Sequence, residues 1–143
     1  MKHLQTLDKP GQKKDFSKSI VVNSGQKVNY ETITDIISSN TTGNISIKAV
    51  VMENGSLTLK GLIKVSPKLN QIEAFLKHSV LLIGNNSNAI SIPELEIESN
   101  DVMVSHASTI GQVDSEQLFY LMSRGFSHTQ SIKIIINSFL CSN

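Results

Sequence analysis

The 143-residue sequence contains no tryptophan and only one cysteine, and aromatic residues make up 5% of it. Because β-sandwich cores are usually filled with large aromatic side chains, this shortage argues against a sandwich. The single cysteine, Cys141, cannot form an internal disulfide, which fits a reducing compartment. We therefore expect a cytoplasmic protein whose core consists of small aliphatic side chains.

The sequence also lacks a charge excess and a long apolar run. Thirteen lysines and arginines are balanced by twelve acidic residues, which gives a formal net charge of +1. No general electrostatic attraction to nucleic acid or anionic lipid follows from this balance. No apolar segment approaches the roughly 20 residues of a membrane-spanning helix. We predict no nucleic-acid and no membrane partner, and a flexible leader over the polar residues 1–15, which contain a Pro-Gly breaker.

Residues 16–110 alternate short aliphatic runs with polar turns. The runs include SIVV, ISIKAVVM, SLTLKGLIKV, SVLLI, AISIPELEI and DVMV, and the intervening turns are rich in Asn, Gly and Ser. Small β-branched and aliphatic residues suit stacked strands, and such turns suit the corners between them. The pattern predicts a mainly β fold, a right-handed β-helix of stacked rungs, although it has no clean repeat period. The segment 28–37 is ambiguous, because its apolar spacing also fits a short helix.

The apolar period changes at Asp114. Either Asp114 or Ser115 can cap a helix by accepting hydrogen bonds from the free N–H groups of its first turn. Helical spacing of apolar residues then recurs at Leu118, Leu121 and Met122, and again at Ile132, Ile135, Ile136 and Phe139. We predict two helices, near 114–124 and 127–140, in a C-terminal helical segment covering 111–143.

A long and unusual string occupies residues 93–126, PELEIESNDVMVSHASTIGQVDSEQLFYLMSRGF. Its core is the spacing SH-x-x-x-x-G-x-x-D-x-x-x-LFYL-x-SRG, and residues 63–84, IKVSPKLNQIEAFLKHSVLLIG, extend the likeness upstream. On these residues the chain resembles the SufB/SufD family of SUF iron–sulfur cluster assembly proteins, in a shortened form of the SufD branch. The resemblance covers a little over half of the chain. It implies a β-helix that acts as a non-enzymatic scaffold or assembly partner in a SUF complex.

Several positions depart from the family pattern. Val104 stands where SufD relatives often carry cysteine, and Ala107 stands where the SufB branch carries glutamate. These departures favour an alternative function, a structural β-helical adaptor that has lost its metal chemistry. A further alternative, an acid-pair hydrolase, depends on Glu94, Glu96 and Glu98, which alternate along one strand and so share a face.

Two histidines are the candidate metal ligands. The resemblance implies that His106 takes part in cluster formation at a partner interface, and neutral imidazole binds iron or zinc. His78 falls where the SufB branch carries its scaffold cysteine, so an imidazole replaces a thiolate. Because about four ligands are typical, two imidazoles leave a metal under-coordinated. Iron or an iron–sulfur cluster is therefore expected to be transient and shared with a partner chain, and Cys141, outside the motif, to be incidental.

The resemblance implies two protein partners. Family members pair through their last β-helix strands, and an edge strand with few inward charges favours pairing. We therefore expect Val102 and Val104 at the seam of a homodimer, or of a heterodimer with a SufB-like chain. The helical end of the family docks the ABC-type ATPase of the SUF system. The candidate contacts for that ATPase are Leu118, Phe119, Tyr120 and Arg124.

Overall fold

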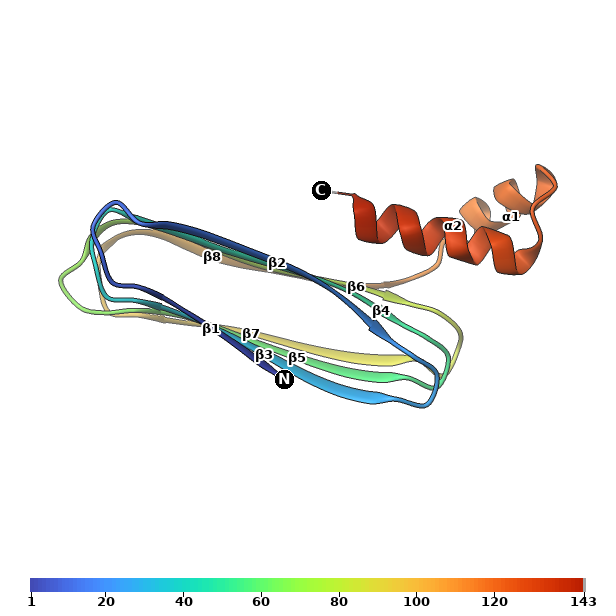
Figure 1. Cartoon of the computed structure of the whole chain (residues 1–143), viewed down its shortest axis with the longest axis horizontal. Helices are drawn as coiled ribbons and strands as arrows, with labels where there is room; N and C mark the ends of the chain where they lie inside the picture. Colours follow the sequence, from blue (N-terminus) through green and yellow to red (C-terminus); the bar gives the residue numbers. More distant parts are fainter. Residues whose placement is uncertain (143) are drawn as a thin grey trace.

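The computed structural model describes residues 1–142 and consists of a strand-rich coil followed by two helices (Figure 1). The strands are β1 (Lys2–Leu7), β2 (Lys13–Val22), β3 (Lys27–Ile36), β4 (Thr41–Val51), β5 (Ser56–Val65), β6 (Asn70–Leu82), β7 (Asn88–Ile97) and β8 (Asp101–Gln112). The helices are α1 (Ser115–Ser123) and α2 (His128–Cys141). The predicted mainly β fold with a C-terminal helical pair is confirmed.

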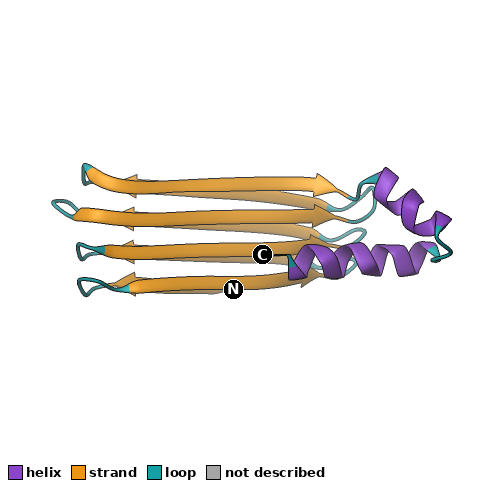
Figure 2. Cartoon of the chain, turned by 90° about the horizontal axis from the view of Figure 1, so that it is seen from above, coloured by secondary structure: helices purple, strands orange, loops and turns teal. Residues whose placement is uncertain are grey.

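The strands form two four-stranded parallel sheets, with the orders β1-β3-β5-β7 (sheet A) and β2-β4-β6-β8 (sheet B). The chain alternates between the sheets, so each turn of the coil adds one strand to each of them, and the turns stack as layers (Figure 2). Gln5 lies beside Thr34, 29 residues further on, whereas Ser56 lies beside Asn88, 32 residues further on. Because the turns differ in length, the sequence has no clean repeat period.

The core lies between the two sheets and is aliphatic. Alternate residues of each strand point inward, as the pleat of a β-strand requires. The fully buried aliphatic side chains include Leu7, Val22, Ile36, Ile45, Ile47, Leu57, Leu59, Ile63, Ile72 and Leu76. The ambiguous segment 28–37 follows the same rule, because it buries every second residue from Tyr30 to Ile36 and forms strand β3. Stacking of small side chains in register replaces the large aromatic fillers that the sequence lacks.

The prediction of a flexible leader over residues 1–15 is wrong. Strand β1 pairs along its whole length with β3, and β2 pairs with β4 from Lys13 onward. Leu7 is fully buried, and the amino group of Met1 donates to the carbonyl oxygen of Asn29 at 2.8 Å. The inward positions of β1 include His3 and a glutamine, so the segment carries little apolar signal. Backbone hydrogen bonds to the next rung order it instead.

Helix α1 begins at one of its two expected caps, and α2 begins close to its expected start. The side chain of Asp114 accepts a hydrogen bond from the backbone N–H of Glu116 at 2.9 Å. Ser127 and Gln130 form a capping box at the start of α2. Gly125, with a φ of 96°, provides the left-handed turn between the helices. No helix within residues 1–142 is long and apolar enough to cross a membrane.

Helix α2 packs on the outer side of sheet B, whereas α1 extends away from the sheets (Figure 1). The apolar face of α2 covers Val50, Leu81 and Ile83. At the far end of α2, the ammonium group of Lys48 donates to the carbonyl oxygen of Phe139 at 3.2 Å. This cation satisfies a carbonyl at the helix C-terminus, where positive charge is favourable. The outer face of sheet B is thus covered along part of its strands only.

Candidate functional site

The last rung, formed by β7 and β8, has no described strand stacked on it. Its inward side chains are therefore covered on one side only, and the backbone edges of both strands are free. Val102 and Val104 pack against the core but remain half-buried, unlike the fully buried residues one rung below. We call the inward face of β7 and β8, together with their free edges, the open end.

His106 lies on β8 at the open end. It follows Val102 and Val104 at a spacing of two, so it shares their inward face, and its register partner on β6 is the buried Leu76. In contrast to Leu76, His106 is exposed, because no rung covers it. Its imidazole can therefore be reached from outside the coil.

His78 lies one rung below, on β6, and is buried with 1% of its surface exposed. Its Nδ1 atom lies 2.8 Å from Oγ of Ser91, whereas its Nε2 atom is buried without a partner. Burial, and secondarily the charge of nearby His106, lowers the pKa of His78 from 6.5 to about 4. The structure thus brings both predicted histidines to the same end of the coil, but only His106 is accessible, and His78 is neutral near pH 7.

Two serines complete this site, and the sequence analysis missed both. Ser91 on β7 bonds to His78, and the hydroxyl of Ser108 on β8 donates to Oγ of Ser91 at 2.8 Å. Ser108 could have been found, because it follows His106 by two residues and shares its face. Ser91 could not, because it belongs to the opposite sheet, and no local pattern indicates which residue lies across the interior.

The described residues do not form a complete metal site by themselves. No group of three or more His, Cys, Asp or Glu side chains among residues 1–142 is close enough to hold a metal ion. Cys141 is exposed at the end of α2. Imidazole nitrogens suit iron, zinc and related ions, but further donors would have to come from outside the chain.

The acidic residues of the hydrolase alternative lie elsewhere. Glu94 and Glu96 are on the outer, solvent-facing side of β7, and Glu96 lies 3.8 Å from the ammonium group of Lys64. Glu98 follows the end of the strand. These carboxylates therefore line an exposed strand face and do not share a cavity with the histidines.

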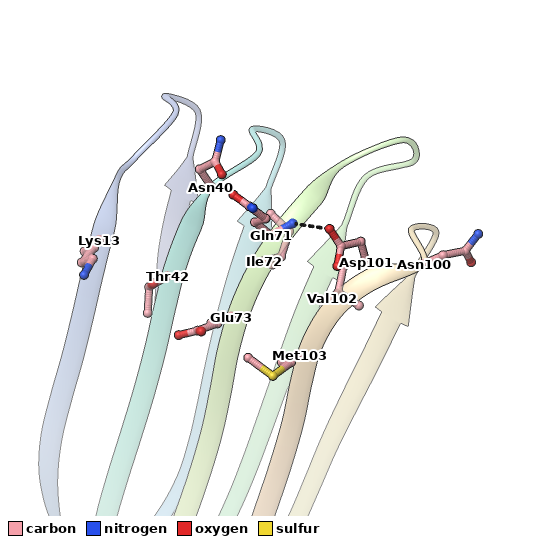
Figure 3. Close-up of a pocket in the computed structure, with 10 residues that line it drawn as sticks. All are labelled: Lys13, Asn40, Thr42, Gln71, Ile72, Glu73, Asn100, Asp101, Val102 and Met103. Atoms are coloured by element: carbon pink, nitrogen blue, oxygen red, sulfur yellow. Dashed lines mark hydrogen bonds between the residues drawn. The ribbon is translucent and has the colours of Figure 1, made fainter.

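The outer face of β8 borders a shallow groove of about 620 Å³ on sheet B (Figure 3). Met103 and Glu73 line it, and near its upper edge the carboxylate of Asp101 accepts a hydrogen bond from the backbone N–H of Gln71 at 3.2 Å. Met103 is 69% exposed. Neighbouring positions of β8 thus serve different surfaces, because Val102 packs toward the core while Met103 faces the groove.

Helix α1 carries the remaining predicted partner contacts. Phe119 and Tyr120 are 74% and 56% exposed, and Leu118 is half-buried. The guanidinium of Arg124 lies 5.1 Å from the centroid of the Tyr120 ring. The structure therefore divides the predicted partner residues between two separate surfaces, the open end and helix α1.

The chain is similar over nearly its whole length to one protein family. Residues 3–139 match the SUF system FeS cluster assembly, SufBD core domain. The chain is 35% identical over 92 residues to the iron–sulfur cluster assembly protein SufD of Escherichia coli, covering 64% of this chain and 22% of that protein. It is 31% identical over 104 residues to an iron–sulfur cluster assembly SufBD family protein of Mycobacterium leprae, covering 73% and 12%.

The SufB branch is represented as well. The chain is 29% identical over 104 residues to the iron–sulfur cluster assembly protein SufB of Bacillus subtilis, covering 73% of this chain and 22% of that protein. The chain therefore spans less than a quarter of the length of these relatives. The match to the family extends further toward the N-terminus than the motifs of the sequence indicated.

Proposed function

The chain belongs to the SufBD core domain family of the SUF iron–sulfur cluster assembly system, and from this premise we propose that it is a SufD-like, non-enzymatic subunit of a SUF complex. The observation that carries the proposal is the position of His106, exposed at the open end of the coil on a strand with a free edge. A ligand placed there can be shared with a second chain that pairs along the same strand.

The partner at the open end is proposed to be a second copy of the chain or a SufB-like chain. Residues 102–112 of β8 contain no Asp, Glu, Lys or Arg. An uncharged edge strand offers its N–H and C=O groups to another strand without electrostatic penalty. A standard interface buries about 1,600 Å² in total, so pairing of this chain would have to involve whole strands. Val102 and Val104 would then lie at the seam, with His106 beside them.

We propose that iron or an iron–sulfur cluster binds transiently at this interface between the two chains. His106 would supply a neutral imidazole, and the partner would supply the donors that the described residues lack. His78, the second predicted ligand, lies one rung below with Ser108 as its register partner, and it would reach the metal only through rearrangement of the last rung.

Helix α1 is proposed as the contact for the ABC-type ATPase of the SUF system. Its exposed Phe119 and Tyr120 are large apolar side chains on a helix that packs mainly on α2. Aromatic and arginine side chains contribute disproportionately to protein interfaces, and Arg124 lies over the Tyr120 ring. Leu118, half-buried beneath them, would support this surface.

A second candidate function is a structural adaptor without metal chemistry. It is favoured by one observation: within residues 1–142 no third donor side chain gathers around the histidine pair. Val104, in the place of a cysteine that the family often carries, points in the same direction. Such an adaptor would keep the open end and helix α1 as interaction surfaces.

Anaerobic reconstitution with ferrous iron and sulfide, in the presence of a SufB-like chain, separates the two candidates. We expect the parent complex to acquire the visible absorption of an iron–sulfur cluster, and His106→Ala to lose most of it. Ser105→Ala, on the outer face of the same strand, is the matched control. Loading that is equal in the parent, His106→Ala and His78→Ala complexes would favour the adaptor.

A further inference from the structure

A chain of hydrogen bonds crosses the interior at the open end. It begins at Ser108 on β8, continues to Ser91 on β7 and ends at Nδ1 of His78 on β6, with both distances at 2.8 Å. Because β6 and β8 belong to sheet B and β7 to sheet A, the chain spans the interior in both directions. It links the last rung to the rung below through side chains, in addition to the backbone ladders.

These hydrogen bonds couple the tautomer of His78 to the two serines. When Ser108 donates to Ser91, the hydroxyl hydrogen of Ser91 is available for Nδ1 of His78; when His78 carries its hydrogen at Nδ1, it donates to Ser91, and the hydroxyl of Ser91 can donate to Ser108. A neutral imidazole that accepts at Nδ1 carries its hydrogen at Nε2. In either arrangement Nδ1 of His78 faces Ser91 on the last rung, whereas Nε2 is buried without a hydrogen-bond partner.

The position of the His78 ring is also limited on its other side, by Gly61 of β5. A Cβ atom at position 61 would lie 3.1 Å from Nε2 of His78 and 2.5 Å from Cδ2 of Leu76. The absence of a side chain at position 61 therefore makes room for the imidazole. His78 is held between Gly61 and Ser91, and this fixed ring is the anchor of the hydrogen-bonded chain.

The Ser108 end of this series of hydrogen bonds lies next to the proposed metal ligand. Ser108 follows His106 by two residues, so both side chains leave β8 on the same face. Since β8 is an edge strand without a covering rung, the orientation of His106 depends on contacts within its own rung and the rung below. The bond from Ser108 to Ser91 is such a contact, and it fixes β8 within two residues of His106.

We propose that Ser91 is a positioning residue, which holds β8 through Ser108 and His78 so that His106 is oriented for a transition-metal ion; this inference depends on the metal-binding role proposed above for His106. Groups hydrogen-bonded directly to a metal ligand typically change metal affinity by about 10- to 100-fold when removed, and Ser91, which is bonded to a neighbour of His106, is expected at the lower end of this range. Ser91 would thus act on the metal without touching it.

The test compares Ser91→Ala with Ser91→Thr, which keeps a hydroxyl, and with Ser105→Ala, which removes an outward hydroxyl from β8. Two properties of the full chain are measured: the protonation of each ring nitrogen of His78 by ¹⁵N NMR, and the affinity for Zn²⁺ alone by calorimetry, with and without an equimolar SufB-like chain. We expect Ser91→Ala to change the tautomer of His78 and to bind Zn²⁺ about 10-fold more weakly. The two controls should resemble the parent.

A serine with only a structural role would change the tautomer of His78 when replaced, but it would leave the Zn²⁺ affinity of the folded protein unchanged. Ser108→Ala removes only the hydrogen bond to Ser91, at an exposed position, and provides a second variant for the Zn²⁺ measurement if Ser91→Ala fails to fold. An unchanged tautomer, or a changed tautomer with unchanged Zn²⁺ affinity, would overturn the inference and leave the proposed function intact. Equal Zn²⁺ affinities of the parent and His106→Ala would instead overturn the metal-binding role itself.

Discussion

The two ends of the coil present the same kind of free backbone edge but very different side chains. At the first rung, Lys14 and Lys18 of β2 are directed inward: the ammonium of Lys14 donates to the carbonyl oxygen of Thr6 at 2.8 Å, and that of Lys18 lies 5.4 Å from the Tyr30 ring centroid. Residues 102–112 of the last rung carry no charged side chain apart from the titratable His106. Inward lysines on an edge strand oppose pairing with another strand, so the comparison supports the proposal that pairing takes place at the open end.

The histidines of the two ends differ in how far they are exposed to solvent. His3, at the first rung, stacks on Phe16 with ring centroids 3.5 Å apart, and its Nε2 atom is buried without a partner. Burial, and then the charge of Lys18, lowers the pKa of His3. His106 is exposed and belongs to the same column of stacked side chains as Phe16. One end therefore encloses its histidine, whereas the other presents it.

The largest expected effect concerns the buried histidine beside the open end. The pKa of His78 is about 4 in the folded state, against 6.5 when unperturbed. Above pH 6.5 both states are neutral; as the pH falls from 6.5 to 4, only the unfolded state gains the proton, so the free energy of unfolding should fall by about 3 kcal/mol and change no further below pH 4 from this group. Urea unfolding at pH 7, 5.5 and 4 measures this.

His78→Leu is the control for this pH dependence. His3 shifts in the same direction and contributes to the total, so the difference between the parent and His78→Leu isolates the contribution of His78. Parallel pH profiles of the two proteins would show that His78 titrates normally in the folded state.

Introducing an inward lysine at the open end would make the last rung resemble the first. Val104→Lys should weaken pairing by about 2 kcal/mol or more, because the ammonium would be desolvated at the centre of the seam. Analytical ultracentrifugation over a concentration series measures the dissociation constant. Met103→Lys, on the groove side of the same strand, is the matched control and should have little effect. An unchanged constant for Val104→Lys would place the interface elsewhere.

Helix α1 offers a way to separate the open end from the second proposed surface. Phe119→Ala removes a 74% exposed ring, and it should weaken binding of a SUF ATPase by about 1 to 2 kcal/mol while leaving pairing unchanged. Val104→Lys should do the reverse. Surface plasmon resonance with the immobilised ATPase tests this, and equal effects of both substitutions on ATPase binding would contradict two independent surfaces.

The smallest effect is expected at the first rung. Lys14→Met removes the hydrogen bond from the ammonium group to Thr6 and should lower the free energy of unfolding by about 1 kcal/mol. It should also make the first rung more prone to self-association, because one inward charge is lost. Urea unfolding and light scattering test the two expectations, with Lys13→Met, on the outer face of β2, as the control. If Lys14→Met and Lys13→Met behave alike, the inward direction of Lys14 has no special role.

Much of this molecule could be predicted from local pattern. The aliphatic runs predicted stacked strands, and the change of period at Asp114 predicted two helices. Strand β1 was missed, because His3 and Gln5 occupy inward positions and the ordering contacts are backbone bonds to a rung 29 residues away. Residues this far apart leave no local signal.

The sequence by itself determined the family, the alternation of inward and outward residues and the caps of both helices, since these depend on neighbours a few positions apart. Only the tertiary structure decided which inward residues meet across the interior. His78 and Ser91 are 13 residues apart and Ser91 and Ser108 are 17 apart, and they meet because the two sheets face each other at a register set by turns of unequal length. For the same reason the structure, and not the sequence, decided that His78 is buried while His106, one rung later in the same sheet, is exposed.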